Sequence, residues 1–276
     1  IAEEVKRERG TPMYEIMAFL TAQNIKARRI EATPERLRAA IDLKLPVIVQ
    51  EEYSTTAHVA VITGYDASLG LFIAADPATH RPLLKSFEWT EHAGDLFGNG
   101  GVIVLGREGV ETEAIEKKAD ELGLVESRHL VLLDECDRLR PRAGSDIPEN
   151  AVLEEVIRLC DEALTLEPMF KLAWHRRFDA RNQLLRLNGH HSAREALLNE
   201  LHELRTTFPG DEWPHQLHAH MLFDDRRFDE ASIEYFEASR RDPGDADNHQ
   251  AMGECSWLVG DLVAAEEHLL ASMALE

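Results

Sequence analysis

The sequence predicts an α+β domain followed by an all-α array of repeated helix pairs. In the N-terminal part, helical patterns come first and short apolar runs rich in β-branched residues follow them. This order is typical of an α+β domain with an antiparallel sheet. In the C-terminal part, Ala231 and Ala265 lie 34 residues apart, as do Pro209 and Pro243. A period of this length indicates helix pairs that stack on one another.

Start signals and apolar runs predict the elements of the N-terminal part. A threonine followed by proline is a typical helix start, because threonine caps the helix and proline suits its first turn. Strands are expected where β-branched residues cluster. In order, the sequence predicts a helix over 1–9, a helix starting at Thr11-Pro12, a strand over 27–31, a helix starting at Thr33-Pro34, a strand over 46–50, a hairpin over 58–76, a short helix over 87–89 and a strand over 101–105.

The hairpin places two polar residues near its open end. Its arms, A-H-V-A-V-I-T-G-Y-D and L-F-I-A-A-D-P, flank the turn A-S-L-G. In a regular hairpin centred on residue 67, His58 and Asp76 would lie directly opposite each other, with Cβ atoms roughly 4.5–5.5 Å apart. Asp76 would then orient the imidazole, as in a nucleophile–His–Asp arrangement. Taken alone, His58 would be a hydrogen-bonded structural histidine at a strand start.

Three short motifs resemble those of the double-glycine-leader peptidases that process bacteriocins, which are papain-like cysteine peptidases. The motifs are P-V-I-V at 46–49, H-V-A-V-I-T-G-Y-D at 58–66 and A-D-P at 75–77, and the resemblance covers about residues 1–106. It implies that His58 is the general base and Asp76 the acid that orients it.

The family's nucleophilic cysteine and its oxyanion-hole glutamine precede the segment that matches this chain from Ile1 onward. Cys136, Cys160 and Cys255 all follow the region of resemblance. The peptidase-like domain is therefore expected to be incomplete, with the cysteine upstream of the chain start.

The C-terminal part resembles the tetratricopeptide repeat. Trp174 stands six residues after Pro168, where that family has its tryptophan, and longer turns are expected around 141–148 and 187–192. The expected organisation is a peptidase-like domain over 1–108, a connecting helix over 109–136 and about four repeats over 137–276.

In the repeat family, the first helix of each pair lines a groove that binds peptides or protein segments. The matching positions here are Leu172, His175, Asp179, Asn182, Trp213, Gln216, His220, Phe223, Asp247, Gln250, Glu254 and Trp257. Aromatic and acidic groups together would suit a basic or amphipathic segment. Alternatively, Trp213 and Phe223 would pack between repeats.

The formal net charge is −21, and most of the acidic excess lies beyond residue 108. Such a surface disfavours nucleic acid, because phosphate contacts need Lys and Arg. It would attract a basic partner, or it is a solvated helical surface. No apolar run reaches about 18 residues, so no membrane span is expected.

The three cysteines occur in helical patterns and do not form a disulfide framework, which fits a reducing, cytoplasmic compartment. His215, His218 and His220 attract a metal interpretation, but only the first two share a helix face and no regular ligand set completes them. We therefore expect neither a metal nor a cofactor.

These patterns predict a cysteine-peptidase-like protein with a peptide-binding repeat module. The main alternative is a catalytically dead peptidase-like domain that docks partners on a repeat scaffold. A third possibility, a purely structural scaffold, would make the match at His58 and Asp76 accidental.

Overall fold

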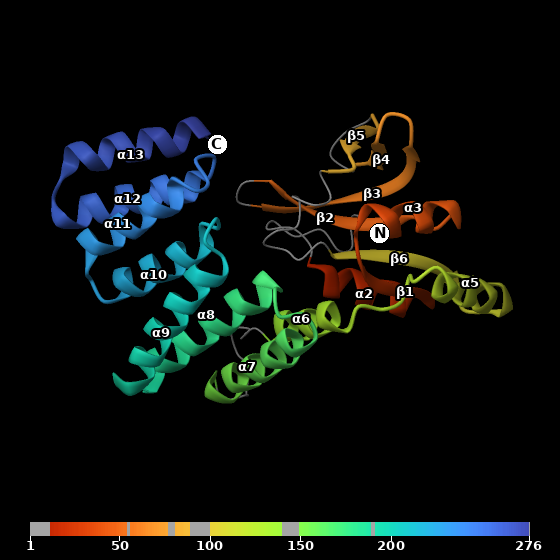
Figure 1. The fold of residues 1–276 in the computed structure, drawn as a ribbon, viewed down its shortest axis with the longest axis horizontal. Coiled ribbons are helices and arrows are strands. Elements are labelled where there is room, and N and C mark those ends of the chain that lie inside the picture. The colour runs from red at the N-terminus through yellow and green to blue at the C-terminus, as the bar shows by residue number, and fades with distance from the viewer. Residues whose placement is uncertain are drawn as a thin grey trace. The chain divides into compact units, whose positions relative to one another are not determined.

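The computed structural model describes residues 12–53, 56–76, 81–88, 100–139, 149–188 and 191–275. The chain divides into two compact units, one of Ile1–Ser145 with Arg158–Trp174 and one of Asp146–Ile157 with His175–Glu276. An antiparallel sheet comes first and a helical region follows, so the order of an α+β part and an all-α part is confirmed (Figure 1). The helix expected over 1–9 lies outside the described residues.

Six strands form one sheet in the order β1-β6-β2-β3-β4-β5, and all its pairings are antiparallel. The strands are β1 (Ile25–Glu31), β2 (Val47–Tyr53), β3 (Thr56–Asp66), β4 (Leu71–Ala75), β5 (Leu83–Ser86) and β6 (Gly100–Arg107). Strand β5 was not expected from the sequence. Residues 87 and 88, expected to begin a short helix, form a turn instead.

Helices cover both faces of the sheet. Helix α2 (Met13–Ala22) buries Met13 and Leu20 against Val102 on one face. On the other face, α3 (Pro34–Asp42) adds Leu37 and Ala40 to the larger core. The side chain of Thr33 accepts a hydrogen bond from the backbone N–H of Arg36 at 3.4 Å, so Thr33 is the expected cap. Helix α2 has Pro12 itself as its N-cap.

Residues 109–136, expected as a connecting helix with Gly123 as its potential break, belong to two helices. Helix α5 (Val110–Glu121) ends before Gly123, whose φ of +73° favours glycine, and α6 (Arg128–Leu139) follows. Between them, the backbone N–H of Ser127 donates to the carbonyl of Arg29 at 2.8 Å, and Ser127 Oγ accepts from the N–H of Glu31 at 3.1 Å. This connection therefore satisfies backbone groups on the outer edge of β1.

A buried ion pair joins β1 to α6. Arg29 Nε lies 2.9 Å from Asp134 Oδ2, and both side chains are buried. Arg29 Nη1 also donates to the carbonyl of Gly101 on β6 at 3.4 Å. Burial lowers the pKa of Arg29, and burial raises the pKa of Asp134 to about 6 although Arg29 opposes that shift.

The helical region continues with α7 (Glu149–Leu166), α8 (Lys171–Asn188), α9 (His191–Thr207), α10 (Trp213–Asp224), α11 (Phe228–Ser239), α12 (Ala246–Val259) and α13 (Leu262–Leu275). The last four helices form two successive antiparallel pairs (Figure 1). Ala231 on α11 and Ala265 on α13 are both buried. A Cβ added to Gly253 on α12 would lie 2.8 Å from Leu269 Cγ, so this helix pair depends on the missing side chain.

We predict that Asp134→Ala lowers the free energy of unfolding by roughly 3–5 kcal/mol, because it leaves the Arg29 guanidinium buried without its counter-charge. Urea denaturation followed by circular dichroism measures the change. The matched control is Asp120→Ala, which removes an exposed partner of Arg28 on the same strand and should cost at most about 1 kcal/mol. Equal costs for the two variants would contradict this role for the buried pair.

Candidate functional site

The β3–β4 hairpin has a register different from the expected one. Val61 pairs with Ala75 and Ile62 with Ala74, so the register continued by one position would place Asp76 opposite Ala60. The prediction that Asp76 directly faces His58 is therefore wrong by two residues. Because side chains alternate between the two faces of a strand, a register shift of two residues leaves each side chain on its expected face. The turn at 67–70, where Asp66 pairs with Leu71, would alone shift the register by three residues, and the irregularity between Ile62 and Gly64 reduces the shift to two.

His58 and Asp76 are described to different extents. The backbone of His58 pairs with Glu51 in β2, and its side chain lies outside the described residues. Asp76 follows directly after β4 and is only 8 % exposed. The assignment of base and orienting acid to these two residues stays a prediction.

Asp66 organises the hairpin turn. Its Oδ1 accepts hydrogen bonds from the backbone N–H groups of Ser68 at 2.9 Å and Leu69 at 3.2 Å, and from Ser68 Oγ at 2.6 Å. These hydrogen bonds lower the pKa of Asp66, and the bond from the Ser68 hydroxyl has the largest effect. Asp66 is thus explained by turn chemistry.

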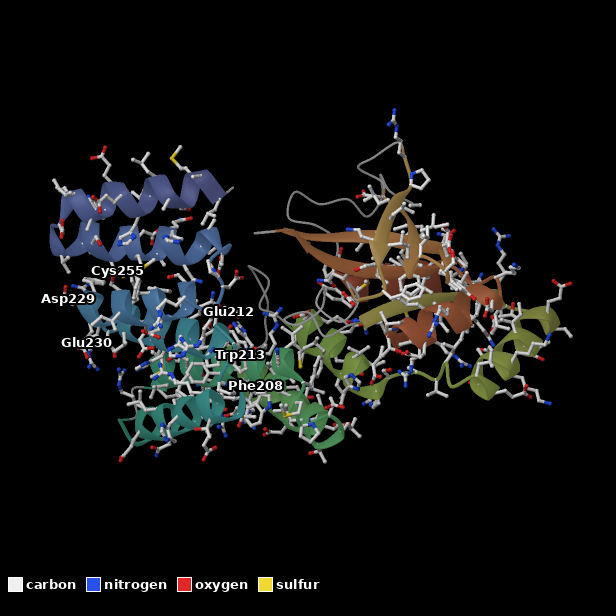
Figure 2. All side chains as sticks on the ribbon, turned by 45° about the horizontal axis from the view of Figure 1, so that its top comes forward. Phe208, Glu212, Trp213, Asp229, Glu230 and Cys255 are labelled. Atoms are coloured by element: carbon white, nitrogen blue, oxygen red, sulfur yellow. The ribbon has the colours of Figure 1, made fainter. Side chains whose placement is uncertain are left out.

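Several of the twelve expected groove residues pack inside the helical region instead of lining a surface. Trp213 is 1 % exposed, and its ring centroid lies 5.2 Å from that of Phe208 (Figure 2). Leu172 is buried as well. Phe223 is half-buried, with its ring 5.2 Å from that of Phe228. These positions contribute to packing, as the alternative interpretation of Trp213 and Phe223 anticipated.

Gln216 joins two helix pairs. Its Nε2 donates to Asp245 Oδ2 at 2.7 Å and to Asn248 Oδ1 at 3.2 Å, so α10 is bound to the start of α12. Burial raises the pKa of Asp245, although hydrogen bonds from the Asp247 backbone and Gln216 oppose that shift. Gln216 is therefore occupied by a structural contact.

The remaining positions on α8 and α10 are partly accessible. His175 Nδ1 lies 3.5 Å from Asp179 Oδ2, one helical turn away, and the His175 ring is 6.5 Å from that of Trp213. Asn182 is half-buried. His220 is exposed, with its ring at 5.7 Å from the ring of Tyr235.

Helix α12 presents the remaining four positions together. Asp247, Gln250, Glu254 and Trp257 are all exposed, and their spacing of three or four residues puts them along one side of the helix. Trp257 is 63 % exposed. Gln250 Nε2 donates to Glu254 Oε1 at 3.0 Å. We call this acidic and aromatic strip of four residues the α12 strip, and it is the part of the expected groove in which every position is exposed.

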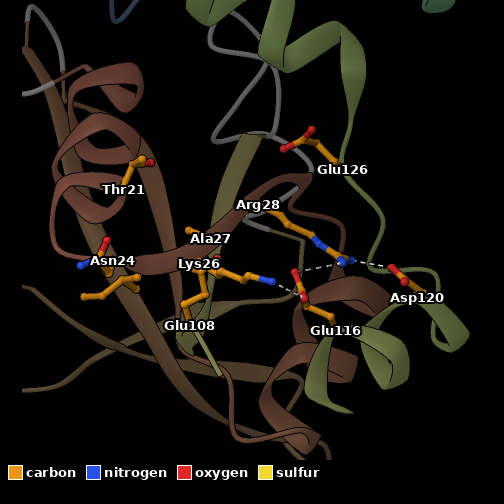
Figure 3. Close-up of a pocket in the computed structure, with 10 residues that line it drawn as sticks. Thr21, Asn24, Lys26, Ala27, Arg28, Glu108, Glu116, Asp120 and Glu126 are labelled. Carbon is orange, nitrogen blue, oxygen red and sulfur yellow. Dashed lines mark hydrogen bonds and ion pairs between the residues drawn. The ribbon is translucent and has the colours of Figure 1, made fainter. Parts of the chain in front are cut away.

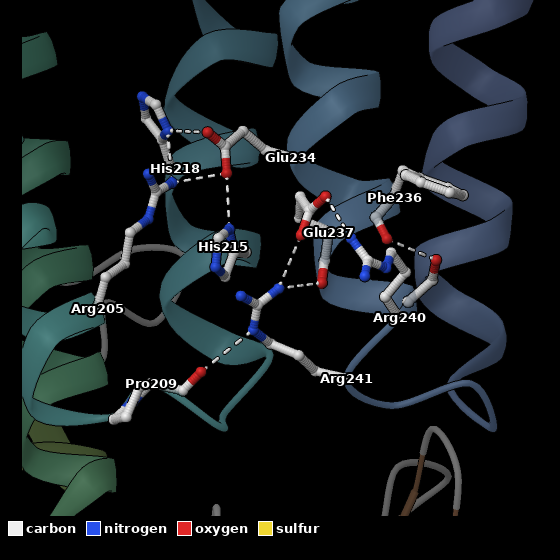
Figure 4. Close-up of polar contacts among 10 residues, drawn as sticks. Arg205, Pro209, His215, His218, Glu234, Phe236, Glu237, Arg240 and Arg241 are labelled. Atoms are coloured by element: carbon white, nitrogen blue, oxygen red, sulfur yellow. Dashed lines mark hydrogen bonds and ion pairs between the residues drawn. The ribbon is translucent and has the colours of Figure 1, made fainter.

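A polar cluster that the sequence did not predict lies between α9, α10 and α11 (Figure 4). At its centre is Glu234: His215 Nδ1 lies 2.8 Å from Glu234 Oε2, and His218 Nδ1 lies 2.9 Å from Oε1. Arg205 Nη2 is 2.6 Å from Glu234 Oε2 and 2.7 Å from His218 Nδ1. The spacing of His215 and His218 in the sequence indicates that they share a helix face. Their partners, Arg205 and Glu234, lie on two other helices and could not be predicted from that spacing.

Opposing effects act on the pKa of Glu234. Burial alone would raise it, but hydrogen bonds with His215 and His218 and the charge of Arg205 hold it well below its usual range. A guanidinium therefore stabilises this carboxylate. Among the described residues, no group of three or more His, Cys, Asp or Glu side chains is arranged to hold a metal ion.

A cleft of about 570 Å³ lies beside β1 and α5 (Figure 3). Lys26 Nζ is 2.8 Å from Glu116 Oε2, and Arg28 Nη1 is 2.5 Å from Asp120 Oδ1. The hydrogen bond with Glu116 raises the pKa of Lys26, although burial opposes it. The described lining contains no histidine, serine or cysteine, and neither His58 nor Asp76 belongs to it. Its chemistry is that of paired surface charges.

The chain matches no protein-family model and no curated protein. Within the described ranges, no helix is long and apolar enough to cross a membrane.

We predict that Glu234→Gln lowers the free energy of unfolding at pH 7 by roughly 1.5–3 kcal/mol, because it removes the charge that His215, His218 and Arg205 share. The folded-state pKa of Glu234 is below its unfolded value of 4.5. The stability it contributes is present above that value and is lost as the pH falls below it. The difference in the free energy of unfolding between wild type and Glu234→Gln should thus become smaller as the pH falls from about 5 to 3.

Urea midpoints measured across this pH range test the prediction. Glu230→Gln is the matched control, because Glu230 is an exposed carboxylate on the same helix that pairs with Arg227, and its midpoint should stay at the wild-type value. A constant gap between wild type and Glu234→Gln at all pH values would contradict the assignment.

Proposed function

We propose that this protein binds a basic peptide or protein segment on the α12 strip, and that its helical region is a tetratricopeptide repeat array. The observation that carries the proposal is Trp257, a large aromatic side chain 63 % exposed on the same side of α12 as Asp247 and Glu254. Exposed aromatic groups beside carboxylates suit Lys and Arg side chains.

The charges around the strip support a cationic ligand. Helix α12 contains neither Lys nor Arg, and no cationic side chain pairs with Asp247 or Glu254 among the described residues. By contrast, Glu200 between the helices is neutralised by Arg177 and Arg181, at 2.6 Å each. The α12 carboxylates are therefore available to an incoming basic group, and the net charge of −21 favours its approach.

The packing of the helices supports the repeat assignment. Helices α11 and α13 begin 34 residues apart, and each buries an alanine at its fourth position. Gly253 permits the close approach of α13 that a repeat of this length uses at small residues.

We predict that Trp257→Ala weakens the binding of an Arg/Lys-rich peptide at least about fivefold, because it removes the aromatic surface on which the cations rest. Glu254→Lys should weaken binding further and reduce its dependence on salt. Fluorescence anisotropy with a labelled basic peptide, and with an acidic peptide of equal length, measures both effects.

Phe236→Ala is the matched control for this experiment, since Phe236 is an aromatic residue 53 % exposed on α11, outside the strip. The Phe236→Ala variant should bind the basic peptide with the affinity of the wild type. Binding that is insensitive to Trp257→Ala, or equal affinity for the acidic peptide, would rule out the α12 strip as the binding surface.

We propose as a second function that the N-terminal part is a papain-like peptidase domain. Support comes from the antiparallel sheet, in which β3 carries His58 and the adjacent β4 ends one residue before Asp76. The mechanism needs a further cysteine, because the three in this chain are buried in α6, α7 and α12. Its thiolate would attack the peptide carbonyl while His58, oriented by Asp76, passes the proton to the leaving amine.

We predict that His58→Ala in the intact protein lowers the rate of cleavage of a double-glycine leader peptide at least about 10³-fold, because the general base is lost. Mass spectrometry of the peptide products measures cleavage, and circular dichroism confirms that the variant is folded. His202→Ala, an exposed histidine on α9, is the control. Cleavage that persists in His58→Ala contradicts the assignment. Binding without cleavage by the wild type favours the docking alternative.

A further inference from the structure

Two of the three cysteines face each other across neighbouring helices. Cys136 on α6 and Cys160 on α7 have their Sγ atoms 3.8 Å apart, although 24 residues separate them in the sequence. Both are buried, at 2 % and 1 % exposure. The third, Cys255, lies on α12 and is the only cysteine of its compact unit.

Two further contacts hold the same two helices together at this point. Arg128 Nη2 on α6 lies 3.6 Å from Glu162 Oε1 on α7, two residues beyond Cys160. At the start of α6, the ring of His129 is 4.9 Å from that of Phe170, just after α7. Cys136 also follows by two residues Asp134, whose buried ion pair with Arg29 attaches α6 to β1. The separation of the two sulfurs is therefore set by a packed contact with several supports.

We propose that Cys136 and Cys160 form a reversible disulfide, which makes the contact between α6 and α7 a redox-modifiable site. Bond formation requires the sulfurs to approach by about 1.8 Å, which small side-chain rotations of two cysteines on facing helices provide. This pair is not predictable from the sequence, because a helical pattern at each cysteine does not reveal which helices meet.

The chemistry requires a two-electron oxidant such as a peroxide. The thiolate of one cysteine attacks a peroxide oxygen, and the O–O bond breaks to give a sulfenic acid. With hydrogen peroxide the leaving group is hydroxide, which becomes water by taking up the proton that the thiol released. The second thiol then displaces hydroxide from the sulfenic sulfur, and the displaced group leaves as water after taking up a proton. In sum, two thiols and hydrogen peroxide give one disulfide and two waters, and a dithiol reverses the change by exchange.

Cys255 provides an internal comparison. Burial raises its pKa to about 11, so little thiolate is present near neutral pH. Its compact unit contains no second cysteine with which it could form a disulfide. The disulfide between Cys136 and Cys160 would close a loop across the connection between α6 and α7, and so restrict the unfolded chain.

The test treats the whole chain with hydrogen peroxide, blocks remaining thiols in denaturant and compares samples with and without dithiothreitol. We expect free thiols to fall from 3 to 1 per chain and the intact mass to fall by about 2 Da. In a non-reducing tryptic digest, the peptide 129–138 should be joined to the peptide 159–171, while the peptide 242–276 keeps its free thiol.

Two variants sharpen the result. Cys255→Ser should form the same linked peptide pair, whereas Cys136→Ser should lose it. The wild-type digest remains decisive even where a variant fails to fold. Three free thiols after oxidation, or links to Cys255 as frequent as links between the other two, would overturn the proposal. Sulfinic acid on Cys136 or Cys160 in place of the disulfide would overturn it as well.

Discussion

The N-terminal unit depends on a charge that has to be buried. Arg29 lies on the edge strand of the sheet, and its guanidinium is taken out of water by α6 and by the carbonyl of Gly101. Such a group is tolerable only with a counter-charge, so Asp134 fixes where α6 sits on β1. The connection before α6 then covers the free backbone edge of β1 through Ser127. A sheet edge that would otherwise invite pairing with another chain is thereby closed.

The helical region handles its acidic excess in two ways. Carboxylates between helices receive dedicated cations, as Glu200 does from two arginines and Glu234 from Arg205 with two histidines. The carboxylates of the α12 strip receive none from the described residues. Glu200 and Glu234 thus differ from the acids of the α12 strip in their neighbours, and this difference supports the proposal that α12 binds a basic ligand.

Local sequence patterns predicted most of the strands and one helix cap, but contacts between residues distant in the sequence could not be predicted. Five of the six strands and the cap at Thr33 follow from β-branched runs and start signals. Strand β5 was missed because L-L-K-S has no β-branched residue. The hairpin register was wrong because the turn lies at 67–70, later than the sequence pattern indicated, and the extra residue near Gly64 corrects only part of that shift. Trp213 could not be placed, since its burial depends on Phe208 before its own helix, and the Glu234 cluster needs three helices at once.

The contact between Gly253 and Leu269 has a mechanical consequence. The space that a side chain of residue 253 would fill is already occupied by a leucine from α13. Side chains normally absorb small displacements by changing rotamer, but a backbone pressed against a neighbour has no such freedom. The spacing of α12 and α13 is therefore set by the main chain itself. A load applied to Trp257, one turn beyond Gly253, would pass to α13 as the motion of one stiff body.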